Sequence, residues 1–489
     1  MTTVDTRLLD AVFGPGEGPT AAARAVGSTQ GFVRGLDQLS FDESSRATGR
    51  RLTAQEALDA YGFDRLCEVA LEGSSLLVDD PRSAGRTLKE RREQLGLQVR
   101  SLVSKTGLPR EIIEALEASK RRPIREYEAV ARVLGLDERL ISFRADRSGN
   151  ERLAVRLRRL ADDRDALQPS GVVALAEASW VAMTQLRLEA KLGLGTSRHS
   201  FDVSSDYGGR WRPAYEVGYE LADQVRSVLE LGVEPVASMR DLVERRLAVP
   251  VIQAPLGERI AGATVRSDTG RRAIVLNIQG KNADASVRRS TLAHELCHLL
   301  FDPDEHLLDL RVDEYAELES RADLRTDRVE QRANAFAVQF LAPQHEAVRR
   351  YEAGDNQALR LVLDAFGISF TAGRYQVWNG LQRTVPLESI VAPNRRPQVD
   401  WEGQEGYTLA FHPIRPLVDH PARAGRFSAV VVAAAERAIV SWDTAASLLC
   451  CSEGEIKAGI DDMHGLFPDV FAIDPAMVNV LPARAEMPG

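Results

Sequence analysis

The sequence has few cysteines and lacks a long apolar segment. Four cysteines in 489 residues, two of them adjacent at Cys450 and Cys451, cannot build a disulfide framework. The longest apolar run, residues 429–435, stops at Glu436 and is too short to cross a bilayer, which needs ~20 apolar residues. The first residues also lack the basic start and apolar stretch of a signal peptide. We therefore expect a reduced, cytoplasmic protein with no membrane partner.

The remaining composition is that of a folded chain with several domains. The balance of 44% hydrophobic and 27% charged residues excludes a wholly disordered chain, and the length fits two to four domains. β-branched runs at 249–252 and 273–278 predict strands, and residues 429–435 fit either a strand or a helix. We predict a multidomain, mainly α protein with these parts: an unassigned region at 1–80 with weak helical patterns, a helical domain at 85–140, a helical linker at 150–232, an α+β domain with a small sheet at 233–385, and a C-terminal domain of unknown role at 390–489.

Positive charge is concentrated in one segment of an acidic chain. The formal net charge is −9, but residues 82–126 carry twelve Lys and Arg against six Glu, which gives +6 there and leaves −15 elsewhere. A basic segment of this kind can bind a polyanion such as duplex DNA. A solvated helical surface would have the same composition, so charge alone does not decide between the two.

The strongest motif is His294-Glu295-Leu296-Cys297-His298, whose apolar flanks predict a helix. Two histidines four residues apart lie on one helix face and can bind one zinc ion together. Glu295 can take a proton from zinc-bound water and pass it to a leaving amine. The strand predicted at 273–278 gives the strand-then-helix order of zinc peptidases. A structural helix with two hydrogen-bonded histidines is the alternative.

Zinc needs a third protein ligand, and the sequence offers several candidates downstream. Most lie in a charged stretch that is typical of solvated surface. Glu330 differs because it begins a helical run with small residues on one face, which can approach another helix closely. Asn334, one turn later, can orient a ligand by a hydrogen bond. The residues alone leave the choice open among Glu305, His306, Asp313, Glu314, Glu317, Glu319, Asp323 and Glu330.

These motifs resemble the ImmA/IrrE family of bacterial metallopeptidases. The resemblance covers about 235–385 and rests on the stretches His294 to His298, Glu330 to Ala337 and Phe340-Leu341-Ala342-Pro343. It implies a gluzincin-type peptidase in which His294, His298 and Glu330 bind Zn²⁺ and Glu295 is the general base. It also implies cleavage of helix-turn-helix repressors, which relieves transcriptional repression. Cys297 and Ala342 replace the family's usual Gly and Met, and neither is a ligand or the base. Cys297 is expected to pack in the core.

Residues 88–136 read as four short helices and resemble the helix-turn-helix of the XRE phage-repressor family. In that family the third helix enters the major groove. The resemblance implies that bases face Arg110, Glu111 and Glu114, and that phosphates contact Arg100, Lys105, Lys120, Arg121 and Arg122. The sequence departs from the family at Pro109, at Ser119 and in its two acids on the reading face, which would have to accept from cytosine amines. The alternative is a helical domain that docks a protein.

The motifs together predict a cytoplasmic transcriptional regulator with zinc-dependent endopeptidase activity that cleaves a repressor or partner regulator. The alternative is a non-catalytic DNA-binding repressor, or the antitoxin of a toxin–antitoxin pair, whose peptidase fold binds a toxin-like partner. A third hypothesis is a metal or redox sensor that uses Cys297, Cys450 and Cys451. His306, Tyr315 and His345 are candidates to stabilise an oxyanion. Residues 442–456 suggest a further helix-turn-helix or a packing or oligomerisation element, which is compatible with a homodimer.

Overall fold

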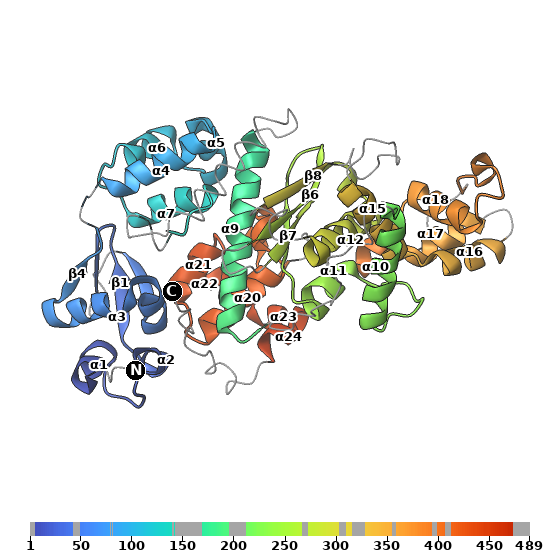
Figure 1. Cartoon of the computed structure of the whole chain (residues 1–489). Coiled ribbons are helices and arrows are strands. Elements are labelled where there is room, and N and C mark those ends of the chain that lie inside the picture. Colours follow the sequence, from blue (N-terminus) through green and yellow to red (C-terminus); the bar gives the residue numbers. More distant parts are fainter. Residues whose placement is uncertain are drawn as a thin grey trace. The chain divides into compact units, whose positions relative to one another are not determined.

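The computed structural model is mainly helical and contains two four-stranded sheets (Figure 1). It describes residues 5–42, 49–78, 80, 82–138, 141, 169–194, 212–266, 272–302, 310–314, 328–354, 358–393, 399–405 and 412–472. The chain divides into two compact units, one formed by 1–164, 172–196 and 409–489 and the other by 165–171 and 197–408. Within the described residues, every helix is too short or too polar to cross a bilayer.

These units divide the chain differently from the sequence analysis. The segment 150–232, expected to be one helical linker, contributes α9 (Pro169–Lys191) mainly to the first unit and α10 (Ala214–Val228) to the second. Residues 409–489 belong with the N-terminal residues, although we expected a separate C-terminal domain from 390 onward. Periodicity is a local property, so it does not reveal which distant segments pack together.

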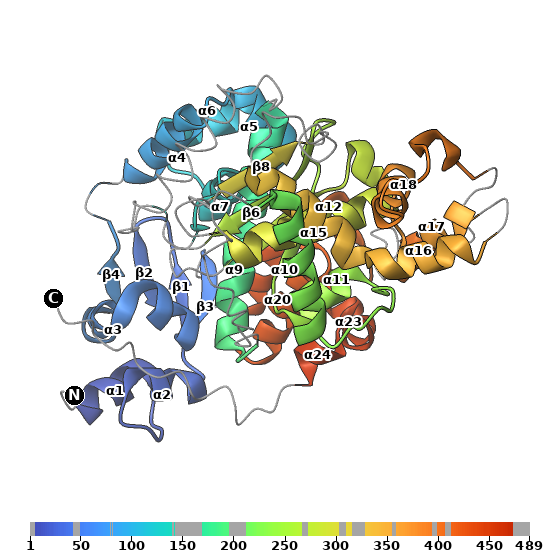
Figure 2. The ribbon, with the colours of Figure 1, turned by 45° about the vertical axis from the view of Figure 1, so that its right-hand side comes forward.

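The first 80 residues contain an antiparallel sheet that the sequence analysis did not predict. The strands run in the order β3-β1-β2-β4 and contact α3 (Figure 2). Phe32, Leu39, Leu52 and Leu66 are buried in the core between them. Strands of three or four residues are too short to show a clear alternation of apolar and polar residues. The bounds are α1 (Thr6–Phe13), α2 (Ala21–Gly27), β1 (Gly31–Arg34), β2 (Gln38–Phe41), β3 (Arg50–Thr53), α3 (Ala54–Glu72) and β4 (Ser74–Leu76).

Four short helices follow in the segment expected to be helical. They are α4 (Ser83–Gln94), α5 (Val99–Thr106), α6 (Arg110–Glu117) and α7 (Ile124–Val133). Gly85 lets α4 meet α6 closely, because a Cβ there would lie 2.3 Å from the carbonyl oxygen of Leu116. Gly107 ends α5 with a φ of 69°. Ser119 adopts a φ of 56°, so the backbone after α6 has the left-handed conformation that glycine would adopt more easily.

The C-terminal part of the first unit is a set of helices around a buried α20. Residues 429–435 are helical and all buried, so the strand alternative for this run is wrong. Two ion pairs tie this part to α9: Arg423 to Glu177 and Arg426 to Glu189, each at 3.0 Å. The bounds are η6 (Arg415–Asp419), η7 (Pro421–Arg423), α20 (Arg426–Glu436), α21 (Trp442–Leu448), α22 (Glu453–Ala458), α23 (Ile460–Leu466) and α24 (Pro468–Phe471).

The second unit is built on a mixed sheet with the strand order β5-β7-β6-β8. β5 and β7 are parallel, and the other neighbours are antiparallel. α12 packs on β6 and β7, α15 packs on α12, and α10 packs on α15. Gly218 of α10 permits the last contact, because a Cβ there would lie 2.3 Å from the carbonyl oxygen of Arg332. The bounds are β5 (Val251–Ala254), β6 (Ile260–Arg266), β7 (Arg272–Asn277), α12 (Ala285–Phe301), β8 (Leu310–Glu314) and α15 (Arg328–Leu341).

Smaller elements complete the second unit. α16, α17 and α18 pack on one another, and their apolar faces join the core that also contains α12 and α15. Arg289 of α12 is buried, and its guanidinium lies 4.1 Å from the centre of the Trp401 ring of α19. The bounds are α11 (Met239–Asp241), the π-helical η2 (Leu242–Arg246), η3 (Gly280–Ala283), α16 (Gln344–Glu352), α17 (Ala358–Phe366), α18 (Phe370–Gly380), η4 (Leu387–Ser389) and α19 (Trp401–Gln404).

Candidate metal centre

A buried amide fixes the position of α12 over the sheet. Asn282 donates to the carbonyl oxygens of Ala261 in β6 (2.8 Å) and Asn277 in β7 (3.0 Å). Its own oxygen accepts from the hydroxyl of Thr291 in α12 (3.0 Å). Each of these groups is buried, so the hydrogen bonds are worth more than they would be in water. The helix that carries the histidines is therefore held in one place relative to β6 and β7.

His294, His298 and Glu330 come together in this unit. The histidines lie one turn apart on α12, and Glu330 lies in the first turn of α15. The two Nε2 atoms are 3.0 Å apart, and the Glu330 carboxylate lies 3.3 Å from Nε2 of His294 and 3.7 Å from Nε2 of His298. All three side chains are buried. Among the described residues, this is the group of His, Cys, Asp and Glu side chains that could hold a metal ion.

The other nitrogen of each histidine contacts an oxygen acceptor. Nδ1 of His294 lies 2.9 Å from Oδ1 of Asn334, and Nδ1 of His298 lies 2.9 Å from Oδ2 of Asp302. Arg332 donates to the second oxygen of Asp302. Asn334 thus lies where the sequence analysis placed an orienting residue. Asp302 was missed, although its place four residues after His298 was an available signal.

This donor set fits a metal ion. Because oxygens accept at both Nδ1 atoms, a neutral imidazole carries its hydrogen there and presents a lone pair at Nε2. Two such lone pairs and a carboxylate then face one another at about 3 to 4 Å. Electron-rich groups repel at this distance unless a cation lies among them. Two histidines and one glutamate are also a set with which proteins hold a catalytic divalent metal while leaving a position open.

Glu295 directly follows His294 in α12 and is fully buried. Its Oε2 accepts a hydrogen bond of 2.8 Å from the hydroxyl of Thr264 in β6. Gly262, two residues earlier in the same strand, makes the space for this carboxylate, because a Cβ there would lie 2.8 Å from Oε1. Neither Thr264 nor Gly262 was among the site residues predicted from the sequence. They precede Glu295 by about thirty residues, and no local pattern links a strand residue to a particular helix residue.

The remaining candidates fall into three groups. Glu305, His306, Tyr315, Glu317, Glu319 and Asp323, with the side chains of Asp313 and Glu314, lie outside the described residues. His345 is exposed on α16. Cys297 is fully buried in the hydrophobic core of the second unit, as expected. Burial raises the pKa of the Cys451 thiol to about 12, which disfavours the thiolate that a metal or redox sensor would use.

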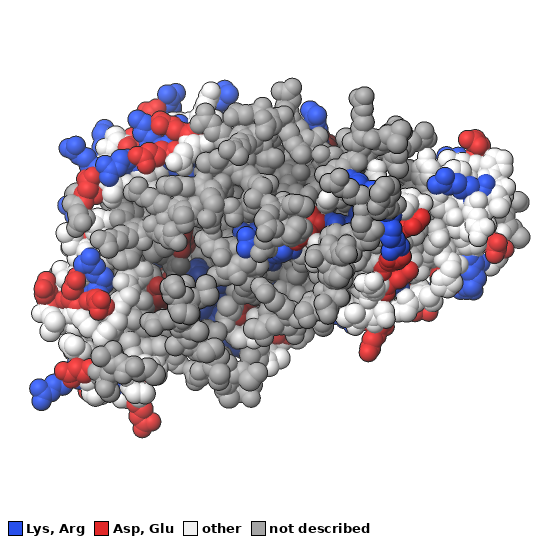
Figure 3. Space-filling model, in the orientation of Figure 1, with Lys and Arg blue, Asp and Glu red and all other residues white. Residues whose placement is uncertain are grey.

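The basic segment is less uniform than its composition suggests. Lys105 lies 3.7 Å from Glu177, and two arginines pair with acids on or beside their own helix, Arg110 with Glu114 and Arg122 with Glu126. Figure 3 shows the two signs of charge intermixed where α4, α5 and α6 lie. Glu111 is exposed on α6. Within the described part of the chain, three exposed cations of the predicted set have no ion-pair partner: Arg100, Lys120 and Arg121.

Comparison with known protein families agrees with the metal centre. The Peptidase M78 model, described as the IrrE N-terminal-like domain, matches residues 245–377. This range contains α12, α15 and all four strands of the second sheet. A search of curated proteins finds no match to the chain. The segment 245–377 is therefore similar to peptidase-fold domains of the ImmA/IrrE kind.

Proposed function

We propose that this chain is a transcriptional regulator whose ImmA/IrrE-type domain is a zinc-dependent endopeptidase that cleaves a repressor or another regulatory protein. The observation that carries the proposal is the buried convergence of His294, His298 and Glu330, with Glu295 buried on the same helix as the two histidines. Burying four ionisable side chains costs free energy that apolar side chains would not cost, so the cluster points to a function. The resemblance to a family that acts on helix-turn-helix repressors supplies the substrate class.

In this proposal the ligands hold the metal and Glu295 moves the protons. A zinc ion held by His294, His298 and Glu330 would lower the pKa of a bound water and polarise the scissile carbonyl. Glu295 accepts the proton that the water loses and donates it to the leaving amine. The hydrogen bond from Thr264 keeps the Glu295 carboxylate in one orientation for both transfers. Asn334 keeps Nε2 of His294 turned toward Glu330, and Asp302 does the same for His298.

The four helices α4 to α7 would bring this activity to duplex DNA. Three exposed cations without an ion-pair partner in the described structure, Arg100, Lys120 and Arg121, are available to phosphates. If these helices bind DNA as the XRE family does, α6 would enter the major groove with Arg110, Glu111 and Glu114 toward the bases. A peptidase held on DNA would meet a repressor at the promoter that the repressor controls. A homodimer would fit paired half-sites on DNA.

A second candidate is a non-catalytic repressor or antitoxin that binds a toxin-like partner. The observation that favours it is the burial of the donor set: both histidine side chains and Glu295 are 0% exposed. A metal that only stabilises the fold would have ligands buried in this way. The two candidates differ in what they require of Glu295, because a structural metal needs the three ligands but needs no general base.

The test is Glu295→Gln in the full chain. The amide keeps the shape of the side chain and an oxygen for Thr264, but it cannot take a proton from water. We expect unchanged zinc content and DNA affinity, with cleavage of the partner protein reduced ~100- to 10,000-fold. The measurements are partner integrity and output of the regulated promoter in cells that carry the variant.

The matched control is Glu352→Gln, which changes an exposed glutamate at the end of α16 in the same unit. This control should cleave and induce as the wild type does. Wild-type induction by Glu295→Gln would rule out the peptidase and leave the repressor or antitoxin hypothesis.

A further inference from the structure

The first unit contains a cavity to which the proposed function gives no role. Its volume is about 720 Å³, within the ~300 to 1,000 Å³ that is usual for small-molecule sites. Its walls come from α5, α7, α9, η7 and α21, together with Arg50 at the start of β3. Segments from both ends of the chain and from its middle therefore surround one space.

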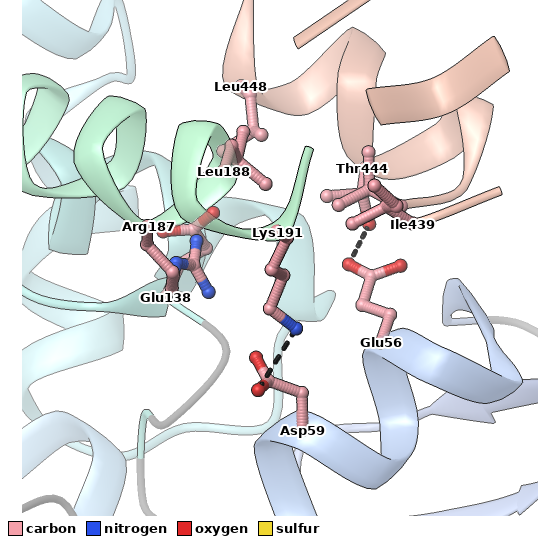
Figure 4. A pocket seen from close by; sticks show the side chains of 10 residues that line it. Glu56, Asp59, Glu138, Arg187, Leu188, Lys191, Ile439, Thr444 and Leu448 are labelled. Atoms are coloured by element: carbon pink, nitrogen blue, oxygen red, sulfur yellow. Dashed lines mark hydrogen bonds and ion pairs between the residues drawn. The ribbon is translucent and has the colours of Figure 1, made fainter. Parts of the chain in front are cut away.

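A second cavity in the same unit is almost completely filled by side chains, unlike the first. Figure 4 shows that its walls approach one another through their own side chains. Lys191 lies 3.0 Å from Asp59, and Thr444 donates to Glu56 at 2.6 Å. The remaining volume is about 10 Å³, which is room for roughly one water molecule. The larger cavity is therefore not a general consequence of loose packing in this unit.

The walls of the large cavity carry an excess of positive charge. Five cations line it: Arg50, Lys105, Arg125, Arg132 and Arg423. Three carboxylates face them: Glu177, Asp419 and Asp443. His420 also lines the cavity, and burial, reinforced by the charge of Arg423, lowers its pKa, so it adds no positive charge at neutral pH. The net charge of the lining is thus +2.

Most of these charges already have partners. Glu177 lies 3.0 Å from Arg423 and 3.7 Å from Lys105, so one carboxylate serves two cations. Asp443 lies 2.6 Å from Arg125. Arg50 pairs with Glu128, which lies behind the lining. Asp419 is exposed.

Arg132 is the exception. It is 8% exposed, and within the described part of the chain its side chain contacts the hydroxyl of Ser447 and no carboxylate. Burial is the main cause that lowers the pKa of this guanidinium, and the positive charge of Arg423 adds to the effect, whereas the buried carboxylates of Glu138 and Glu128 oppose it from beyond ion-pair distance. A buried cation that no carboxylate contacts directly is costly, and an anion in the cavity would offset part of that cost.

We propose that this cavity binds a small organic anion through a phosphate or carboxylate group, with Arg132 as the main charge partner and Lys105 and Ser447 as further donors. Guanidinium groups bind both kinds of anion by charge-assisted hydrogen bonds. The volume admits a ligand up to about the size of a mononucleotide. Ala129, Val133 and Ala446 give part of the wall an apolar surface for the rest of such a ligand.

The position of the cavity also connects the anion with the proposed DNA binding. The lining includes Ser104 to Thr106 of α5 and four residues of α7, on one side, and residues of α21 on the other. A ligand that contacts both sides favours the arrangement of helices to which it binds best. DNA affinity and anion affinity would then depend on each other reciprocally. This consequence rests on the proposed DNA binding, whereas binding of the anion does not.

The test is isothermal titration calorimetry of the full chain with three probes: inorganic pyrophosphate, AMP and citrate. We expect one site per chain for at least one probe, and Arg132→Met should weaken its Kd by about tenfold or more. Arg132→Lys keeps the charge and should retain part of the affinity. A preference for pyrophosphate or AMP identifies a phosphate ligand, and a preference for citrate identifies a carboxylate ligand.

Two controls separate a binding role from a structural one. Arg65→Met removes a partly exposed arginine of α3 that pairs with Glu68, and it should bind the probe as the wild type does. Without any anion, Arg132→Met should still unfold in one cooperative transition, so that a loss of binding is not a loss of the fold. Two results would each overturn the proposal: no binding by any probe, or wild-type binding by Arg132→Met. Loss of DNA binding alone would not overturn the proposal that the cavity binds an anion, since no DNA is present in the calorimetry.

Discussion

The candidate metal centre and the helices α4 to α7 are both rich in charged residues, but their charges have different surroundings. At the metal centre, His294 and Glu330 come from different helices and are buried together. On the four helices, Arg110 and Arg122 are neutralised by acids one turn away in the sequence. Burial of a charge costs free energy, whereas an exposed charge costs almost nothing. A buried cluster therefore limits the possible functions much more than an exposed patch of equal charge.

The largest expected effect is loss of the metal in Glu330→Ala. If the donor set is a zinc site, removal of its one carboxylate ligand should weaken zinc binding by more than ~100-fold, beyond what loss of an outer contact costs. Glu352→Ala changes an exposed glutamate of the same unit and should keep one zinc per chain. Zinc content of the purified variants is the measurement. One zinc ion per chain in Glu330→Ala would show that Glu330 is not a metal ligand.

The next prediction compares the two residues whose side-chain oxygens contact Nδ1 of the histidines. Asn334→Ala and Asp302→Ala each remove an acceptor at Nδ1, and we expect zinc affinity to fall by ~10- to 100-fold. Asp302→Ala should also lower the free energy of unfolding by about 3 to 5 kcal/mol, because Arg332 loses a buried carboxylate partner. Asp302→Asn keeps an oxygen for His298, so its zinc affinity and its stability should lie between those of the wild type and those of Asp302→Ala. Competition with a chelator and denaturant unfolding are the measurements, and equal stability of both alanine variants would contradict the buried pair.

A smaller effect should follow from Gly262→Ala. The added Cβ would lie 2.8 Å from Oε1 of Glu295 and 3.2 Å from the carbonyl oxygen of Val275, so the buried carboxylate must shift and the strand must yield slightly. We expect normal zinc content and a modestly lower Tm, with cleavage slower by up to ~100-fold, because a small displacement of a catalytic group is enough. Gly465→Ala, where a Cβ would meet nothing within 4 Å, is the control. Wild-type cleavage rates in Gly262→Ala would show that the position of Glu295 does not matter.

The sequence predicted the parts of the site that follow from local spacing. A four-residue interval on a helix places His294 and His298 on one face, and the helical run after Glu330 indicated a closely packed partner helix. The resemblance to a known family then selected Glu330 among eight candidates. Thr264 and Gly262 could not be found in this way, because their contacts with Glu295 depend on how β6 lies under α12.

The same limit explains the differences in the fold. The four helices at 83–133 were predictable because Gly107 and the apolar spacing mark their ends and inner faces. The N-terminal sheet was not, since strands of three or four residues give no clear period. The cavity around Arg132 was also beyond reach, because its walls come from segments up to about 400 residues apart. Local patterns identify elements, and only packing shows which of them share a space.

The smallest expected effect concerns two adjacent arginines on the exposed surface of helices α4 to α7. Arg121 is exposed and has no ion-pair partner in the described structure, whereas Arg122 lies 2.7 Å from Glu126. If α4 to α7 bind DNA, Arg121→Ala should weaken binding to all sequences and reduce the slope of log affinity against log salt by ~1, because one phosphate contact is lost. Arg122→Ala should reduce that slope by less, since part of its charge already serves Glu126. Affinities measured over a series of salt concentrations decide the matter. Equal slopes for both variants would mean that the ion pair opens on DNA, and an unchanged slope in both would remove this surface from the DNA contact.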